Sequence, residues 1–456
     1  MYSCEIILQE FQIVKKIQLS DHFTYRRLIR FIMPSVIMMV FTSLYGVVDG
    51  IFVSNYAGKT PFAAINLIWP VVMILGGIGF MFGTGGSALV AKILGEQNQK
   101  YANRVFSAIV YASAVLGILL SVLGLMFLRP IVGILGGEGQ LAEDCVLYGA
   151  VLFSAVVTFI LQNEFQTLLV VAEKPKMGLY VTVAAGFTNI ILDYLLIGVL
   201  GWGLFGAAMA TALSQLVGCV IPLFYFFFNK KGVLRLGKPG WYPKELWKAC
   251  SNGASEMLSN ISMSLVNVLY NFQFLSLAGE NGLSAYGVMM YVNFVFVSAF
   301  LGYSMGVAPI ISYHFGAKNH SELHNLFQKS MVILVASSLG MFLCAEFLSK
   351  PFSAVFVGYD QALFEMTHRG FIIYSVSYLF VGINIFSSAF FTALNNGLVS
   401  AVLSFCRTFL FQVASVLVLP FFFQLDGIWS SVVVAELLAL IVSLGCFFGF
   451  QKRYQY

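Results

Sequence analysis

The stretch that decides the fold is residues 67–95, LIWPVVMILGGIGFMFGTGGSALVAKILG, together with residues 288–316, VMMYVNFVFVSAFLGYSMGVAPIISYHFG. Each is long and apolar enough to cross a bilayer as a helix, which takes about 20 residues. The two stretches are 221 residues apart, so that Gly85 aligns with Gly306 and Gly95 with Gly316. This pattern predicts a membrane protein built from two related halves.

The same spacing continues along the chain without a gap, and many of the matched residues lie near the ends of apolar runs. It pairs Asn98 with Asn319, Pro130 with Pro351, Asn163 with Asn384, and Gly206 with Gly427. Chance aligns apolar residues easily, but it rarely aligns glycine and proline, which occupy restricted backbone conformations. We therefore interpret the halves as two copies of one unit.

The composition is that of a chain surrounded by lipid. Of 456 residues, 59% are hydrophobic and 10% are charged, and the mean hydropathy is +0.87. Soluble domains average about 25% charged residues. Twelve apolar runs lie near residues 31–57, 62–91, 104–128, 146–172, 177–199, 205–228, 247–278, 284–313, 326–348, 368–393, 398–421 and 428–450.

Six runs per copy is an even number, so both copies enter the membrane from the same side. The sequence thus predicts an all-α integral membrane protein with about twelve transmembrane helices in two parallel six-helix repeats around a central cleft. We expect a cytoplasmic lead-in at 1–30, an N-terminal lobe at 31–228, a cytoplasmic linker at 229–246 and a C-terminal lobe at 247–456.

The charged residues predict the orientation. With the N-terminus inside and the runs alternating, 20 of the 25 Lys and Arg fall on the inner side and 4 on the outer side. Because Lys and Arg resist translocation, this bias places both termini in the cytoplasm of a multi-pass protein of the inner (plasma) membrane. The net charge of +5 reflects this orientation, so we expect no nucleic-acid partner.

Ionisable side chains inside the apolar runs are the candidates for function, because each costs about 2.5–3.5 kcal/mol to insert. The acids are Asp49, Glu164, Asp193, Glu256 and Glu436, and the one base is Arg407. In the second copy, the positions of the first three acids are held by Tyr270, Ile385 and Ala414. A structural role is more often kept in both copies, so this asymmetry favours an ion-coupling site in the first half.

Asn189 and Asp193 are four residues apart and share a helix face. A carboxylate beside an amide carbonyl suits Na⁺, which prefers oxygen ligands. The same carboxyl could instead carry a proton, because burial favours a neutral acid. A purely structural hydrogen-bonding role stays open for Asp193 and also for Glu164.

Enzyme and metal chemistry find no support in the motifs. The chain has no HExxH, no GxSxG and no phosphate-binding loop, so we expect no enzymatic activity. Its seven cysteines form no CxxC, which disfavours a disulfide framework or a metal cluster. His314, His320 and His324 fall in a connection, where we expect a solvated loop. We expect no cofactor apart from a coupling ion.

Several motifs resemble those of the multidrug and toxic compound extrusion (MATE) transporters, and the likeness covers essentially the whole chain. Val47-Val48-Asp49-Gly50, followed by Tyr56-Ala57-Gly58, is similar to the acidic motif of the family's first helix. Ser87-Ala88-Leu89-Val90-Ala91 with Gly95 is similar to the end of the family's second helix. Residues 308–319, APIISYHFGAKN, are similar to the counterpart of that motif in the family's second half.

The resemblance implies a cation site in the first lobe, formed by an Asp on the first helix, an Asn and an Asp on the fifth and a Thr on the sixth. These correspond to Asp49, Asn189, Asp193 and Thr211. It also implies an antiporter, driven by H⁺ or Na⁺, that exports amphipathic and often cationic drugs or metabolites by alternating access. We expect a monomer whose partners are the lipid bilayer and these small molecules.

The chain departs from members of the family that carry a second-lobe site. Glu256 lies near the start of the seventh run, and the tenth run has no acid after Glu365. Glu256, Arg407 and Glu436 could instead form a buried charge network, with function or structural support equally open. The alternative function is a flippase for lipid-linked glycans or lipids, whose architecture is related. It would require a strongly cationic cavity, and Arg407 is the only buried base.

Overall fold

The computed structural model describes residues 17–56, 59–229, 232–238 and 240–456, and this described part contains helices and no β-strand. In chain order the helices of the first half are α2 (Tyr25–Tyr56), α3 (Lys59–Gly95), α4 (Gln99–Ile134), α5 (Gly139–Ser154), α6 (Val156–Val171), α7 (Pro175–Asp193), the π-helical turn η1 (Tyr194–Val199) and α8 (Gly203–Phe228). Those of the second half are α9 (Pro243–Gly316), α10 (His320–Val357), α11 (Gln361–Ser375), α12 (Tyr378–Ala393), α13 (Gly397–Phe405), the π-helical turn η2 (Cys406–Leu410), α14 (Phe411–Val418) and α15 (Pro420–Tyr454).

The described helices account for the predicted twelve spans. Nine helical segments are long and apolar enough to cross a membrane, and two bent pairs raise the number to eleven. The 74 residues of α9 are too many for one crossing, and Gly279 breaks this helix with a φ of 61°. Counting α9 as two spans gives twelve. The fold class predicted from the sequence is confirmed.

The two bent pairs occupy the same place in each copy. Helices α5 and α6 meet at Ala155 with a bend of 52°, and α11 and α12 meet near Val376 with a bend of 49°. Ala155 and Val376 are separated by 221 residues, the repeat spacing. Neither bend has a proline to signal it, and the sequence analysis treated each pair as one straight span.

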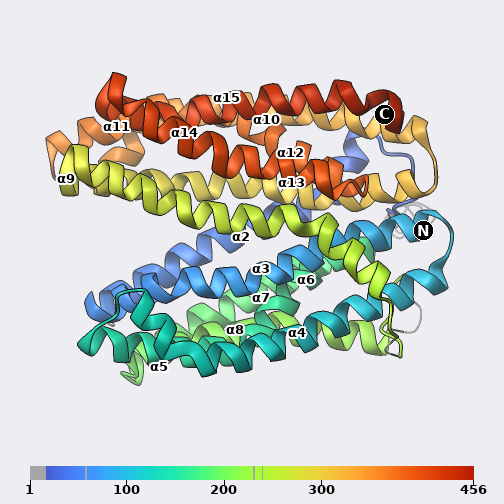
Figure 1. The fold of residues 1–456 in the computed structure, drawn as a ribbon, viewed down its shortest axis with the longest axis horizontal. Helices are drawn as coiled ribbons and strands as arrows, with labels where there is room; N and C mark the ends of the chain where they lie inside the picture. Colours follow the sequence, from blue (N-terminus) through green and yellow to red (C-terminus); the bar gives the residue numbers. More distant parts are fainter. Residues whose placement is uncertain (1–16, 57–58, 230–231, 239) are drawn as a thin grey trace, which may run out of the picture.

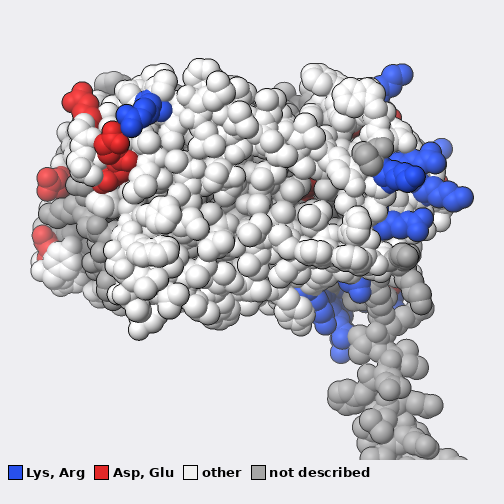
Figure 2. Space-filling model, turned by 90° about the horizontal axis from the view of Figure 1, so that it is seen from below, with Lys and Arg blue, Asp and Glu red and all other residues white. Residues whose placement is uncertain are grey.

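Figure 1 shows the helices arranged in two bundles, one made of α2–α8 and the other of α9–α15. The C-terminus and the visible start of the chain lie at the same end of the molecule, which we call the terminus end. On the face drawn in Figure 2, Lys and Arg gather at this end and most of the Asp and Glu at the other. The broad band between them is nearly free of charged side chains, as expected where lipid surrounds the protein.

The polar connections of the terminus end pack against the bundles. Within the predicted linker, the Arg235 amide donates to Asn103 Oδ1 at 2.7 Å and the Gly237 amide to Ser107 Oγ at 2.8 Å. Ahead of α2, the Phe23 amide donates to Glu322 Oε1 at 2.9 Å. Residues 1–16 of the predicted lead-in, and 230, 231 and 239 of the linker, lie outside the described residues.

One expectation at this end was wrong. His314 does not lie in a solvated loop but in the last turn of α9, where its side chain is 2% exposed. The backbone of Leu19 and Asp21 lies beside the imidazole ring and covers it. The sequence did not reveal this cover, because the covering segment is almost 300 residues away along the chain.

Glycines bring the two bundles into backbone contact near the terminus end. A Cβ added at Gly85 of α3 would lie 2.0 Å from the Ala249 carbonyl oxygen of α9 and 2.5 Å from the Gly253 nitrogen. Such separations are far inside van der Waals contact, so only glycine allows the two helices to approach this closely. The helix that packs against Gly85 thus belongs to the other bundle.

A second pair of contacts repeats the same geometry about the axis that relates the copies. A Cβ added at Gly95 would lie 2.0 Å from the Tyr313 carbonyl oxygen, and one added at Gly316 would lie 2.0 Å from the Lys92 carbonyl oxygen. Gly306, the repeat partner of Gly85, packs against Ile32, the repeat partner of Gly253. We call Gly85, Gly95, Gly253, Gly306 and Gly316 the glycine seam.

Replacing Gly85 with valine should weaken the seam. The added atoms overlap the backbone of α9, and overpacking of this kind costs about 1–3 kcal/mol. We expect a lower unfolding temperature for detergent-solubilised protein, measured by intrinsic fluorescence. Gly133→Val is the control, because nothing lies within 4 Å of a Cβ at that position. Equal unfolding temperatures for the two variants would contradict the seam.

Candidate functional site

The three sequence-predicted residues Asp49, Asn189 and Asp193 come together between α2 and α7. Helix α7 carries Gly186 one turn before Asn189, and a Cβ there would lie 2.6 Å from the ring of Phe41 on α2. This close approach brings the second half of α2 against α7. The carboxyl group of Asp49 consequently lies beside the side chains of Asn189 and Asp193.

Four of the five side-chain oxygens of this cluster lack a hydrogen-bond donor. Asp193 is completely buried and Asn189 is 2% exposed. Within the described residues, Asp49 Oδ1, Asn189 Oδ1 and both carboxyl oxygens of Asp193 have no hydrogen-bond partner. Two carboxyl groups placed together in a medium of low polarity cannot both remain ionised unless a cation or a proton joins them. The donor-free oxygens therefore fit a hard cation such as Na⁺, and equally a shared proton.

The backbone changes its hydrogen-bonding pattern directly after Asp193. Helix α7 ends at this residue, and the chain continues as the π-helical turn Tyr194–Val199. Its last bond runs from the Leu200 amide to the Leu195 carbonyl at 2.9 Å, five residues back. Short π-helical turns occur frequently at functional sites, because they shift the side chains that follow out of the regular helical register. The residue types of this segment do not predict a π-helical turn.

Two tyrosines belong to the surroundings of the acids and were missed by the sequence analysis. Tyr148 of α5 is near enough to both Asp49 and Asp193 for their charges to act on it, and Tyr45 is near Asp49. Tyr45 precedes Asp49 by four residues on the same helix, so the i, i+4 spacing would have revealed it. Tyr148 comes from a distant helix, and no sequence signal indicated it.

Thr211, which the resemblance alone suggested, lies on α8 and is buried. Its carbonyl accepts a hydrogen bond from Ser214 Oγ at 2.8 Å. Helix α8 packs against α7, so Thr211 belongs to the same bundle as the acids. Among the described residues, no hydrogen bond joins it to Asp49 or Asp193. Its part in ion binding stays a prediction.

The second bundle has no acid at the equivalent place. Tyr270, the repeat partner of Asp49, donates its hydroxyl to Gln412 Oε1 at 2.8 Å and lies 2.7 Å from Ser431 Oγ. The positions of Asn189 and Asp193 are held by Leu410 and Ala414. A satisfied tyrosine and two apolar side chains thus replace the donor-free oxygens of the first bundle.

The second bundle holds a buried ion pair instead. Arg407 Nε donates to the two carboxyl oxygens of Glu436 at 3.0 and 3.1 Å. Asn384 Nδ2 donates to Glu436 Oε2 at 2.7 Å, and Ser443 Oγ donates to Asn384 Oδ1 at 3.1 Å. Glu256 lies near enough to Arg407 to feel its charge. The structure joins Arg407 with Glu436 directly and adds Asn384 and Ser443, which the sequence analysis did not select.

The remaining acid, Glu164, lies apart from both clusters. It is in the middle of α6 and completely buried, and it has neighbours on α4 and α8. The His, Cys, Asp and Glu side chains of the described residues form no group of three or more that could hold a metal ion.

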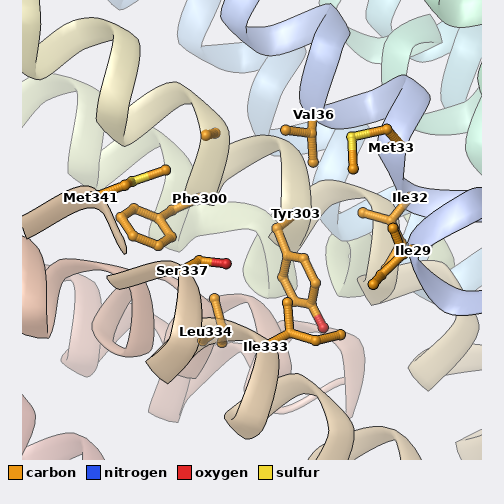
Figure 3. A pocket seen from close by; sticks show the side chains of 11 residues that line it. Ile29, Ile32, Met33, Val36, Phe300, Tyr303, Ile333, Leu334, Ser337 and Met341 are labelled. Atoms are coloured by element: carbon orange, nitrogen blue, oxygen red, sulfur yellow. The ribbon is translucent and has the colours of Figure 1, made fainter. Parts of the chain in front are cut away.

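A cavity of about 220 Å³ lies where α2 meets the second bundle, and it contains none of the candidate residues. Apolar side chains of α2, α9 and α10 line it, among them Met33, Phe300 and Met341, and the Tyr303 ring stands at its centre in Figure 3. Ile29 and Met33 on its rim are each 42% exposed. The cavity shows that the first half of α2 packs against the second bundle. The second half of α2, which carries Asp49, packs within the first bundle.

The fold and the buried acids define a polytopic helical membrane transporter. A sequence model of the MatE family matches residues 34–195 and 256–418, one match in each half. Together the matches cover more than half of the chain. The chain belongs to the MatE family, the family of MATE transporters.

Relatives and solved structures agree with this assignment. The chain is 24% identical over 437 residues to the multidrug export protein MepA of Staphylococcus aureus strain MRSA252, covering 92% of this chain and 93% of that protein. It is 22% identical to MepA of Staphylococcus saprophyticus, with the same coverage. A MATE structure in complex with MaL6 superposes with a TM-score of 0.90 at 21% identity, covering 97% of this chain and 98% of the other.

Another solved structure, the outward-facing conformation of a multidrug resistance MATE family transporter, superposes with a TM-score of 0.89 at 22% identity, with coverage of 97% and 98%. At these identities the superpositions show the fold alone.

Removing one partner of the buried ion pair should destabilise the second bundle strongly. Glu436→Gln leaves the largely buried Arg407 without its hydrogen-bonded counter-charge, and breaking a buried pair costs about 3–5 kcal/mol. We expect a marked fall in unfolding temperature in detergent.

The control is Glu143→Gln, because Glu143 pairs with Arg129 at the surface, where the two side chains are 60% and 72% exposed. Exposed pairs contribute little, so that variant should match the wild type. A Glu436→Gln protein as stable as the wild type would show that Arg407 is balanced by another group.

Proposed function

We propose that this chain exports amphipathic, often cationic compounds in exchange for H⁺ or Na⁺ bound at Asp49, Asn189 and Asp193, with Thr211 as a further ligand. The single observation that carries the proposal is the set of buried, donor-free oxygens between α2 and α7. The names of the relatives support the substrate class, because the Staphylococcus proteins are multidrug export proteins.

The same oxygens suit the two coupling ions in different ways. Na⁺ would take carboxylate and amide oxygens as ligands, whereas a proton would be shared between the facing carboxyl groups of Asp49 and Asp193. Either ion removes the repulsion between these groups and lets α2 and α7 pack closely. Without the ion, the two carboxyl groups repel each other and α2 and α7 tend to separate. Ion binding and the arrangement of these helices are therefore linked.

Export then requires that the ion and the substrate prefer different arrangements of the two bundles. We propose that the terminus end faces the cytoplasm, in line with the Lys and Arg gathered there, and that the protein lies in the plasma membrane as a monomer. The glycine seam closes this end in the described structure. Parting of the seam would open a path from the cytoplasm, and its closure would release the substrate on the other side.

The flippase alternative is less well supported. A pyrophosphate-linked lipid needs several free cationic side chains in a central cavity. Among the described residues inside the spans, the base that the sequence analysis identified is Arg407, and it is bound to Glu436. Its positive charge is therefore already balanced.

The test is efflux of a fluorescent cation from proteoliposomes under separately imposed proton and Na⁺ gradients. We expect one of the two gradients to drive efflux by the wild type. Asp193→Asn should insert and fold normally but lose gradient-driven efflux, because the site then cannot neutralise the incoming ion.

The matched control is Tyr270→Phe, at the position of Asp49 in the other copy, which removes hydrogen bonds and no carboxyl group. It should retain gradient-driven efflux. Undiminished efflux by Asp193→Asn would remove the acids from the coupling step. If neither gradient acts on the wild type and glycan-lipid translocation is observed, the flippase would be the better description.

A further inference from the structure

Glu164 is a buried acid inside the spans that neither the coupling site nor the ion pair uses. It lies on α6 with no exposed surface, and within the described residues neither of its carboxyl oxygens has a hydrogen-bond partner. The residues on either side of it, from Phe159 to Val171, are all buried as well. Its carboxyl group is therefore cut off from water and from lipid headgroups.

The elements packed around Glu164 bring no compensating charge. The hydroxyl of Ser113 on α4 lies beside the carboxyl group, and the thiol of Cys219 on α8 lies near it. Helix α3 presents Gly83, where an added Cβ would lie 3.2 Å from the Glu164 Cα atom. Among the described residues of these helices, Cys219 is thus the one titratable group that faces Glu164, and no Lys, Arg or His does.

The coupling site is too distant to share a proton with Glu164 directly. Helices α6 and α7 are antiparallel and joined by the short turn between Val171 and Pro175. Asp193 lies 18 residues beyond the start of α7, or about 27 Å along it, and Glu164 lies 7 residues before the end of α6, or about 11 Å. The difference places Glu164 about 16 Å nearer to the terminus end than Asp193.

The surroundings favour a protonated side chain in this structure. A bare carboxylate without a counter-charge costs several kcal/mol in such a place. A protonated carboxyl group can instead donate to Ser113 Oγ, which is also buried and without a partner in the described structure. The fold itself does not need an acid here, because Ile385 fills the equivalent position of the second bundle.

Helix α3 lies between the backbone of α6 at Glu164 and the glycine seam. Gly83 faces Glu164, and Gly85, two residues further and about 200° around the helix, faces α9 of the other bundle. One helix, with glycine at both contacts, thus separates Glu164 from the boundary between the bundles. When the seam parts, water reaches the side of α3 that faces α9, and this one helix then separates the water from α6 at Glu164.

We propose that Glu164 is a second proton-binding site of the first bundle, protonated while the terminus end is closed and deprotonated when that end opens. The proton leaves the Glu164 carboxyl group for water at the terminus end and returns from the same water on closure. Because protonation accompanies the closed arrangement, a rise in pH on the terminus side favours opening. This inference rests on the proposed alternation between two arrangements, but not on Asp49 or Asp193 as the coupling site.

The test measures the opening of the terminus end against pH. Spin labels on cysteines at Lys100 and Ser321, which are exposed and are repeat partners, report the separation of the bundles in a background without the native cysteines. In the wild type the distance between the labels should increase as the pH rises. Glu164→Gln, which keeps the shape of the neutral acid, should hold the distance at its closed value over the same range.

A second measurement detects the proton itself. Infrared difference spectra between low and high pH should contain a carbonyl band of a protonated carboxylic acid that disappears in Glu164→Gln. Ser113→Ala should shift this band, whereas Ser121→Ala on the same helix should not, because Ser121 donates to the Phe153 carbonyl instead. If Glu164→Gln does not fold, Glu164→Ile, with the residue of the other copy, replaces it.

The outcomes separate this proposal from the function proposed above. Opening of Glu164→Gln with the pH dependence of the wild type, or an unchanged infrared band, would overturn the second proton site. Undiminished efflux by Asp193→Asn would overturn the coupling site and leave the behaviour of Glu164 as it is. Loss of pH-dependent opening in Glu164→Gln, together with loss of the band, supports the proposal.

Discussion

Hydrocarbon offers no hydrogen bonds, and this constraint shapes the whole molecule. Every backbone amide and carbonyl in the membrane must find a partner within the protein, which leaves helices as the building material for a chain of this composition. The same constraint makes an unpartnered polar side chain conspicuous. Most buried hydroxyls and amides here bond to a nearby backbone carbonyl or to another side chain, as Asn384 does with Glu436 and Ser443 does with Asn384. The donor-free oxygens of Asp49 and Asp193 stand out against this background.

The two bundles meet the constraint in different ways. In the second, Arg407 and Glu436 neutralise each other, and Tyr270 is satisfied by Gln412 and Ser431. The hydrogen bonds and charges of these residues are satisfied within the protein, without a bound ion. In the first, the acids have no cationic partner among the described residues, which is the basis of the proposed ion site. In that proposal the second bundle is the stable counterpart against which the first changes its state.

Much of this could be predicted from the sequence, because hydropathy reports the transfer of side chains from water to lipid. The twelve spans and the buried acids follow from that transfer, and the repeat follows from glycine and proline residues matched at one spacing. The close approach of Asn189 and Asp193 follows from helical spacing. What the sequence did not reveal depends on contacts between distant segments or on backbone geometry. The bend at Ala155, the π-helical turn after Asp193, the burial of His314 and the nearness of Tyr148 are of this kind. Thr211 came from family resemblance, and its contact with the acids is still a prediction.

The contacts of the glycine seam have the symmetry of a dimer. Gly95 meets Tyr313 as Gly316 meets Lys92, which is the reciprocal pattern of a dimer of identical subunits. A six-helix ancestor that paired with itself would have made both contacts with one surface. While the subunits were identical, any acid gained by one was gained by both, at twice the cost of insertion. Two copies joined in one chain are free of that restriction, and here one half holds Asp49 where the other holds Tyr270.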